Sequence, residues 1–325
     1  MAVERAPRGT LRWGLLSTAP INRHLIPAIR AAGRAELLAV ASRSADTAAA
    51  YAAEWGIPRA YGGYESLLAD PDVDVVYIST PHSLHAEWTV RAAQAGKHVL
   101  CEKPLALTVA DCERIDAAVQ EAGVVATEAV MYLYHPLLHQ VRQLVREGIV
   151  GEVNLVRGSF CFFLSRPSST RRQPELGGGA LWDVGLYPVS FARWICGEPE
   201  AVQGWEHLGL SGVDESFAGL LRFPHGVLGV FDCGFQSPYR TFAEVAGSTG
   251  ALIIKRPFNI NAATRLIIRR DQEEEELAVP EAEPYHCEVE ALTAAALDGV
   301  PLAVPLAWSR ANVATLVRLY ESARH

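Results

Sequence analysis

Short apolar runs alternate with amphipathic segments over the first 129 residues, and this alternation constrains the fold more than any other feature. The apolar runs lie at 11–16, 37–41, 75–79, 98–101 and 124–127, and the helical segments between them include 46–55, 82–95 and 109–122. Strands and helices in turn form right-handed βαβ crossovers around a buried parallel sheet. The pattern predicts an α/β fold, a doubly wound Rossmann domain over residues 1–129.

The rhythm changes after residue 130, where strand-like segments follow one another. A helix is expected at 136–147 and two more at 285–297 and 308–322; strands are expected at 152–164, 200–208, 216–223, 227–235, 241–246, 251–255 and 264–270. Pro224-His225-Gly226 is a turn between two of them. We interpret the acidic run 273–276 as a solvated hairpin tip. Residues 130–325 are therefore predicted to form an α+β domain with a mostly antiparallel open sheet.

Charge and cysteine usage exclude several classes of function. Lys and Arg total 29 against 37 Asp and Glu, so a nucleic-acid or anionic-membrane partner is disfavoured. The first ten residues are charged and lack the apolar core of a signal peptide, and no apolar run approaches the ~18 residues of a membrane span. The six cysteines show neither CxxC nor zinc-ligand spacing, which predicts free thiols, no metal and a cytoplasmic location.

The turn after the first predicted strand is a candidate dinucleotide-binding loop. Its three glycine positions are taken by Ser17, Ala19 and Asn22, with Thr18 and Ile21 completing the loop. An ordinary strand–loop–helix connection fits the turn alone equally well. Its place after strand one of a βαβ unit favours the pyrophosphate site, because phosphates bind at the following helix N-terminus.

The end of the second predicted strand indicates which dinucleotide binds. A site that prefers NAD usually places an acid here for the ribose 2′-hydroxyl, whereas this chain has Ser42, Arg43 and Ser44. Arg43 can pair with a 2′-phosphate and stack on adenine. We predict NADP(H) as the preferred cofactor, with NAD(H) possible; the alternative is an ordinary surface arginine after a strand.

Several motifs together resemble the glucose–fructose oxidoreductase / inositol dehydrogenase / MocA family over nearly the whole chain. They are the Gly14–Asn22 turn, Thr80-Pro81…His85, Glu102-Lys103-Pro104, and Gly177-Gly178-Gly179…Asp183…Tyr187. Within that family the chain looks like the NADP-dependent branch of dihydrodiol dehydrogenases and aldose (xylose-type) dehydrogenases. Tyr187 stands where the inositol dehydrogenase pattern has histidine, which argues against an inositol-type substrate.

The chemistry of the residues agrees with that resemblance. Pro104 keeps Lys103 extended as it leaves a strand at the carboxyl edge of the sheet. Asp183 and Tyr187 lie four residues apart on a predicted helix and should share a face, and the preceding glycines should let that helix approach the cofactor domain. Because a nearby ammonium lowers a phenol pKa, we predict Tyr187 as proton donor and acceptor, Lys103 as its electrostatic partner and substrate-oxygen ligand, and Asp183 as the orienting group. The two domains would each contribute one half of the site.

Each of these residues also has an ordinary interpretation. Taken singly, Asp183 could cap a helix, Tyr187 could be a core tyrosine and Lys103 could be solvated. The resemblance implies that Glu102 contacts the nicotinamide ribose and that Thr80, Pro81 and His85 line the cofactor crevice; His85 could equally be a satisfied supporting histidine. Candidate substrate contacts are His82, Arg172 and Trp182, although a solvated loop is the favoured interpretation for Arg171 and Arg172.

We therefore expect an NADP(H)-dependent dehydrogenase or reductase that acts on CH–OH groups of a sugar, polyol or cyclic diol. One alternative is a redox-neutral sugar-modifying enzyme that keeps its cofactor tightly bound. A second is a non-catalytic NADP-binding regulator, which should lack Lys103 or Tyr187. A homodimer or larger homo-oligomer is expected through the C-terminal sheet, because Val227, Leu228, Val230 and Phe231 make one strand apolar on both faces.

Overall fold

The computed structural model describes residues 9–324 and divides them into two compact units. Of these described residues, the first unit contains 9–106, 110–134 and 283–309; the second contains 107–109, 135–282 and 310–324. The boundary expected at 129/130 thus lies a few residues later, and a segment near the C-terminus returns to the first unit. The first eight residues, on which the expectation of no signal peptide depends, lie outside the described part.

The first unit contains a six-stranded sheet in the order β3-β2-β1-β4-β5-β6, and all its paired strands are parallel. Its strands are β1 Leu11–Leu16, β2 Ala35–Ser42, β3 Arg59–Gly62, β4 Val75–Ile78, β5 His98–Glu102 and β6 Ala126–Ala129. The strand order reverses between β1 and β4, the place where open α/β sheets bind ligands at their carboxyl ends. The predicted Rossmann sheet is confirmed, with β3 as an addition that the sequence pattern did not reveal.

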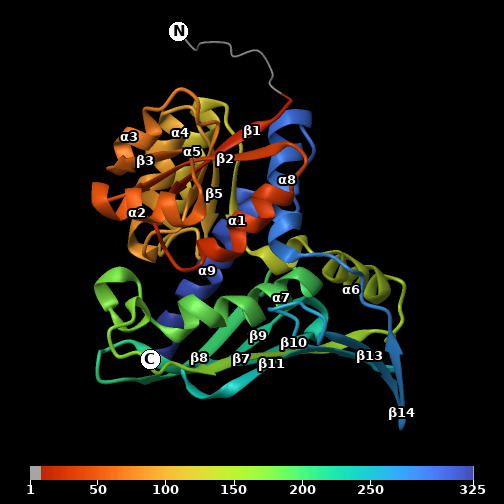
Figure 1. Ribbon diagram of the computed structural model, residues 1–325. Coiled ribbons are helices and arrows are strands. Elements are labelled where there is room, and N and C mark those ends of the chain that lie inside the picture. Colours follow the sequence, from red (N-terminus) through yellow and green to blue (C-terminus); the bar gives the residue numbers. More distant parts are fainter. Residues whose placement is uncertain (1–8, 325) are drawn as a thin grey trace. The chain divides into compact units, whose positions relative to one another are not determined.

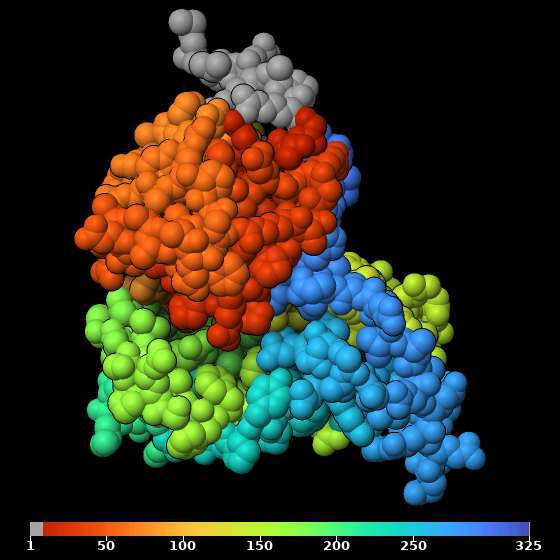
Figure 2. Space-filling view, viewed as in Figure 1, coloured from red at the N-terminus to blue at the C-terminus, as the bar shows by residue number. Residues whose placement is uncertain are grey.

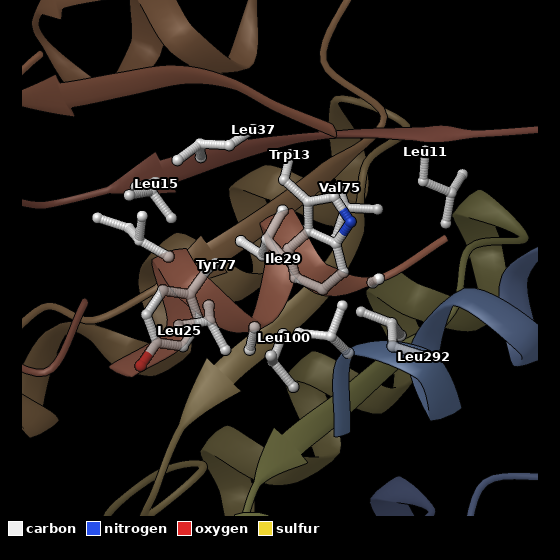
Figure 3. Packing of buried hydrophobic residues seen from close by; sticks show 14 of the residues in the cluster. Leu11, Trp13, Leu15, Leu25, Ile29, Leu37, Val75, Tyr77, Leu100 and Leu292 are labelled. Atoms are coloured by element: carbon white, nitrogen blue, oxygen red, sulfur yellow. The ribbon is translucent and has the colours of Figure 1, made fainter. Parts of the chain in front are cut away.

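Helices of the first unit pack against this sheet (Figure 1). They are α1 Asn22–Ala31, α2 Ala45–Trp55, α3 Tyr64–Leu68, α4 His85–Gln94, α5 Val109–Ala122 and α8 Pro284–Asp298. Helix α8 belongs here because Val289 and Leu292 are fully buried in the same cluster as Trp13 and Val75. Figure 3 shows Leu292 among these residues. The core of the unit therefore joins residues that lie far apart in sequence, such as Trp13 and Leu292.

The second unit is an eight-stranded sheet in the order β14-β13-β12-β11-β7-β10-β9-β8. Its strands are β7 Val153–Phe163, β8 Ala201–Leu208, β9 Asp214–Arg222, β10 Leu228–Gly234, β11 Gln236–Gly247, β12 Ala251–Lys255, β13 Arg265–Arg270 and β14 Glu273–Leu277. Every neighbouring pair is antiparallel except β7 with β10. The predicted mostly antiparallel sheet is confirmed; α6 Pro136–Arg146, α7 Leu186–Cys196 and most of α9 Leu306–Ala323 complete the unit.

The acidic run 273–276 corrects one expectation, because it forms an edge strand instead of a hairpin tip. Glu274 lies opposite Arg269 at 2.5 Å, and Glu276 lies 3.1 Å from Arg265. Cross-strand pairs of opposite charge stabilise a ladder, and charges on an edge strand discourage pairing with another chain. The β13–β14 hairpin stands out from its unit at the lower right of Figures 1 and 2.

None of the helices in the described part is both long enough and apolar enough to cross a bilayer. No group of three His, Cys, Asp or Glu side chains among residues 9–324 is arranged to hold a metal ion.

Candidate functional site

A buried hydrogen-bond network holds the turn after β1. The Ser17 hydroxyl lies 2.7 Å from the Ser79 hydroxyl and also accepts from the Ala19 backbone N–H at 3.1 Å. Asn22, fully buried at the start of α1, donates to the Ser17 carbonyl and accepts from the Ser79 hydroxyl, at 2.8 and 2.7 Å. Ser17 has φ 147°, a region that favours glycine. Polar side chains therefore shape a turn that glycines usually form, at the switch point of the sheet.

His85 joins two loops at the carboxyl edge of the sheet. It is fully buried, with Nε2 2.8 Å from the Thr80 carbonyl and Nδ1 2.7 Å from the Pro104 carbonyl. Both ring nitrogens therefore contact backbone carbonyls of the protein. Of the two interpretations of His85, this agrees with a supporting histidine and corrects the expected direct contact with the cofactor. Burial lowers the pKa of His85, and the charge of Lys103 lowers it further.

Lys103 follows β5 directly and is half-buried. The preceding Glu102 accepts a hydrogen bond from the Tyr77 hydroxyl at 2.5 Å, so one of its carboxylate oxygens is engaged below the edge of the sheet. Burial foremost, and then the charge of Glu102, raise the pKa of Tyr77, which keeps this hydroxyl a donor. The sequence pattern gave no sign of Tyr77, because a tyrosine within an apolar strand has the appearance of a core residue.

The end of β2 places Ser42, Arg43 and Ser44 as the sequence predicts. Ser42 is buried, while Arg43 and Ser44 are exposed. Ser44 caps α2, because its hydroxyl accepts from the Thr47 backbone N–H at 3.3 Å. The charge of Arg43 acts on Tyr64, where it opposes the burial that raises the pKa of that phenol. Arg43 therefore lies at the strand end with its guanidinium accessible to a ligand phosphate.

One further observation, at the Thr80 hydroxyl, agrees with dinucleotide binding at the carboxyl edge of the parallel sheet. The Thr80 hydroxyl oxygen is buried and has no hydrogen-bond partner within the described residues, although an unsatisfied buried polar atom is costly. NADP bound at this edge would contact the 17–22 turn and would give the Thr80 hydroxyl a partner. Pro81, half-buried beside it, begins the short helical turn that contains His82.

In the second unit, Asp183 lies in a π-helical turn, Leu181–Gly185, that runs into α7. Such turns are rare and occur frequently at functional sites. Asp183 is 3% exposed and accepts from Arg171 Nε at 2.5 Å. The wider turn means that Asp183 and Tyr187 do not belong to one regular α-helix, so their spacing of four does not by itself place them on one face.

Two glycines of the 177–179 segment serve contacts within this unit. A Cβ on Gly178 would lie 2.6 Å from the Arg171 carbonyl oxygen, and a Cβ on Gly179 would collide with Asp214. These two glycines thus make room for close packing within their own unit, and their expected role toward the cofactor domain stays a prediction.

Tyr187 is 7% exposed and packs in an aromatic cluster on the sheet. Its ring centre lies 5.2 Å from that of Phe160 and 5.6 Å from that of Phe258. Gly158 of β7 lets the helix approach, because a Cβ there would lie 2.7 Å from Pro188 Cβ. Phe160 of β7 and Phe258 of the segment between β12 and β13 therefore both pack against the ring of Tyr187.

The remaining candidates separate into different environments. Arg171 is exposed, as a solvated loop predicts, although it pairs with Asp183, whereas Arg172 is partly buried and pairs with Glu215 at 2.8 Å. Trp182 packs with its ring centre 5.5 Å from that of Tyr320. The ring centre of His82 lies 5.6 Å from that of His85. Sequence reasoning missed Arg171 and Ser79 as partners of site residues, since each acts through a contact that only the fold creates.

Comparison with known proteins gives matches to two family models. The model described as oxidoreductase family, NAD-binding Rossmann fold, matches residues 12–130, and the GFO/IDH/MocA C-terminal domain matches residues 138–253. Together they cover most of the chain.

Two curated relatives are similar over most of their length. A D-xylose 1-dehydrogenase (NADP(+)) of Haloferax volcanii is 36% identical, with 96% of this chain and 97% of the relative covered. A trans-1,2-dihydrobenzene-1,2-diol dehydrogenase of Mus musculus is 33% identical over 81% of this chain and 79% of its own.

Among solved structures, a 3-ketoreductase from Actinomadura kijaniata in complex with NADP and TDP-benzene superimposes with a TM-score of 0.91. It is 32% identical, with 96% of this chain and 98% of that chain covered. The same reductase has been crystallised as variants in which a lysine is replaced by alanine and a tyrosine by phenylalanine.

Proposed function

The chain belongs to the GFO/IDH/MocA family of oxidoreductases with an NAD(P)-binding Rossmann fold, and from that premise we propose that it interconverts a carbonyl and an alcohol on a sugar, polyol or cyclic diol. One observation carries the proposal. Lys103 leaves β5 at the carboxyl edge of the sheet, and His85 ties the following Pro104 to the Thr80 loop. A cation at this edge supports the proposal, because folds of this kind bind their ligands at the carboxyl ends of the strands.

We assign NADP(H) to the carboxyl edge of the first unit. Ser17, Thr18, Ala19, Ile21 and Asn22 form the turn for the pyrophosphate, and Ser42, Arg43 and Ser44 recognise the 2′-phosphate. The nicotinamide, when bound, accepts or supplies the hydride. Thr80, Pro81 and Glu102 contact the nicotinamide end, with His85 supporting them from beneath.

The residues of this chain then manage the proton and the developing charge. Tyr187 takes the proton from the substrate hydroxyl during oxidation and returns it during reduction. Lys103 binds the same substrate oxygen and favours the phenolate form of Tyr187 through its positive charge. Asp183, held by Arg171, orients the substrate or the tyrosine. The lysine and tyrosine variants of the 3-ketoreductase direct attention to the same two residue types.

An absorbance assay at 340 nm tests the proposal, with NADP⁺ and NAD⁺ each supplied against aldoses, polyols and trans-diols. We expect turnover with at least one member of the panel and a lower KM for NADP⁺. A preparation that retains cofactor through purification and converts sugar without net absorbance change would instead establish the redox-neutral alternative. Cofactor binding without turnover on the whole panel would favour the regulator.

We also propose a homodimer that associates through the sheet of the second unit, and a reducing, cytoplasmic location. Leu228 and Val230 of β10 are 50% and 38% exposed, and Leu220 of β9, which pairs with Val230, is 45% exposed. Phe231 is buried and half-buried Val227 precedes the strand, so the proposed surface excludes those two expected residues. All six cysteines are free thiols, which supports the reducing compartment.

A further inference from the structure

Asp214, the first residue of β9, is a buried carboxyl that the proposed chemistry does not use. It is 2% exposed. Its Oδ2 accepts from the backbone N–H of Leu181 at 2.7 Å, and its Oδ1 accepts from the Tyr320 hydroxyl, also at 2.7 Å. One side chain therefore joins the sheet, the helix α9 and the first residue of the π-helical turn.

That turn depends on Asp214 for its first hydrogen bond. The residue before it, Ala180, offers no side-chain cap, although the first N–H groups of a helix need external acceptors. Gly179 packs directly on Asp214, and its carbonyl accepts from the Asp183 N–H at 3.1 Å. The contacts thus run from Asp214 through Leu181 and Gly179 to Asp183.

The opposite face of β9 holds the same loop from its other side. Glu215, the next residue along the strand, pairs with Arg172 at 2.8 Å, while Arg171 reaches Asp183. Because neighbouring residues of a strand point to opposite faces, Asp214 and Glu215 bind different residues of this segment. Asp214 accepts from Leu181, and Glu215 pairs with Arg172. Asp214 and Glu215 thus hold residues of the segment that leads to Asp183, a role that the sequence pattern does not reveal.

We infer that Asp214, held by Tyr320, is a positioning residue that sets the turn bearing Asp183 and that does so fully only as a carboxylate. A carboxylate accepts both hydrogen bonds, whereas a protonated Asp214 must donate through one of its oxygens, so the Tyr320 hydroxyl has to turn and accept instead. The catalytic consequence rests on the proposed function, but the geometry of the turn does not.

The surroundings of Asp214 place its titration near neutral pH. Burial foremost raises its pKa to about 7, the hydrogen bonds from Tyr320 and Leu181 lower it, and the charge of Glu206 on β8 raises it. Burial also raises the pKa of Tyr320, which therefore remains a hydroxyl donor. Asp214, Tyr320 and Trp182 are among the residues that line a pocket of about 420 Å³. The other titratable groups nearby are Cys233 on β10, Asp183 on the turn, Glu321 on α9 and Arg324 just after that helix.

The sign of the linked stability follows from the raised pKa. Between the ordinary value of 3.8 and about 7, the unfolded chain ionises this carboxyl while the folded chain keeps it protonated. The free energy of unfolding should therefore fall as pH rises through this window and level off above it. Asp214→Asn, which cannot ionise, should lack this component of the slope and should still fold.

The experiment compares Asp214→Asn, Tyr320→Phe and Glu206→Gln in the full chain. We expect kcat of the wild type to fall below pH 7, and Asp214→Asn to lose about ten- to a hundred-fold in kcat at pH 8 with the KM for NADP(H) unchanged. Tyr320→Phe should move the acidic limb to higher pH, because it removes a bond that lowers the pKa. Glu206→Gln should move the limb to lower pH. General loosening of the fold would not produce shifts of opposite sign.

Asp70→Asn is the matched control, because Asp70 also accepts a tyrosine hydroxyl and a backbone N–H, from Tyr61 and Asp72 at 2.8 Å each. Its kcat should equal that of the wild type.

A readout that does not depend on substrate binding is the tryptophan fluorescence of the wild type minus that of Trp182→Phe, titrated from pH 5 to 9 without substrate. A transition near pH 7 that is absent in Asp214→Asn supports the inference even if no oxidoreductase activity is found. A flat fluorescence titration, or pH limbs that do not move in Tyr320→Phe and Glu206→Gln, would overturn it.

Discussion

At the scale of single residues, Tyr187 and Lys103 provide the most direct test of the proposed chemistry. Tyr187→Phe removes one oxygen and leaves the contacts of the ring with Phe160 and Phe258, so folding and cofactor affinity should persist. We expect kcat to fall about 10²–10⁴-fold, the usual share of general acid–base catalysis. Lys103→Ala should slow turnover at least as much, and the double variant little more than the worse single variant.

Steady-state kinetics with a substrate for which chemistry limits the rate would measure these losses. Tyr61→Phe, which removes a hydroxyl bonded to Asp70, is the control. Retention of more than about a third of the wild-type kcat by Tyr187→Phe would reject the assignment.

Arg43 carries the second prediction at this scale. Its guanidinium is exposed at the end of β2, where an acid would select NAD. Arg43→Asp should weaken NADP⁺ binding by about 1.5–3 kcal/mol, roughly ten- to a hundred-fold, and should reverse or erase the preference. Calorimetric titration of both dinucleotides would measure this change. Tighter binding of NAD⁺ than of NADP⁺ by the wild type would contradict the prediction.

Sequence alone indicated the residues whose chemistry is itself unusual in context, such as Lys103 before a proline and Asp183 after three glycines. It did not indicate Ser79, Tyr77 or Asp214, and it assigned Arg171 to a solvated loop without its partner Asp183. Each of these four gains its role from a partner distant in the chain or across a loop, and none belongs to a pattern of spacing. Pairings of this kind become visible only when the fold brings the partners together.

At the scale of elements, the close approach of α7 to β7 sets the position of Tyr187. Gly158→Ala would place a methyl group 2.7 Å from Pro188 Cβ, so helix and strand must separate. Overpacking of this kind costs about 1–3 kcal/mol, and kcat should fall with it. Denaturant unfolding and kinetics would measure both effects. Gly33→Ala, where the added methyl meets nothing within 4 Å, should change neither, and an unaltered Gly158→Ala protein would show that the contact does not matter.

Elements with strong periodicity were predictable, as the match of 11–16 and 109–122 to β1 and α5 shows. The misses have local causes. Strand β3 is only four residues long and lies at the edge of its sheet. Strand β14 consists mostly of glutamates, which are not typical of a strand, and it pairs with β13, whose arginines lie beside those glutamates. The π-helical turn has no sequence pattern distinct from that of an α-helix.

At the scale of the whole molecule, the apolar face of the second sheet predicts self-association. Leu228→Lys with Val230→Lys should yield a monomer, because two charges would be buried at the interface. Sedimentation velocity at micromolar concentration would distinguish the species. Leu210→Lys, fully exposed in a turn outside the strands, should leave the oligomer intact. A wild-type protein that sediments as a monomer would refute the dimer.

The return of residues 283–309 to the first unit has a consequence for how the protein is made. A ribosome releases the six strands of the parallel sheet early, yet the helix that carries Val289 and Leu292 emerges only after the whole second unit has been synthesised. Until then the face of the nascent sheet around Trp13 lacks the side chains that cover it in the finished molecule. The first unit is thus among the last parts of the protein to be completed. While α8 is still being synthesised, the apolar surface around Trp13 would be open for a chaperone to bind.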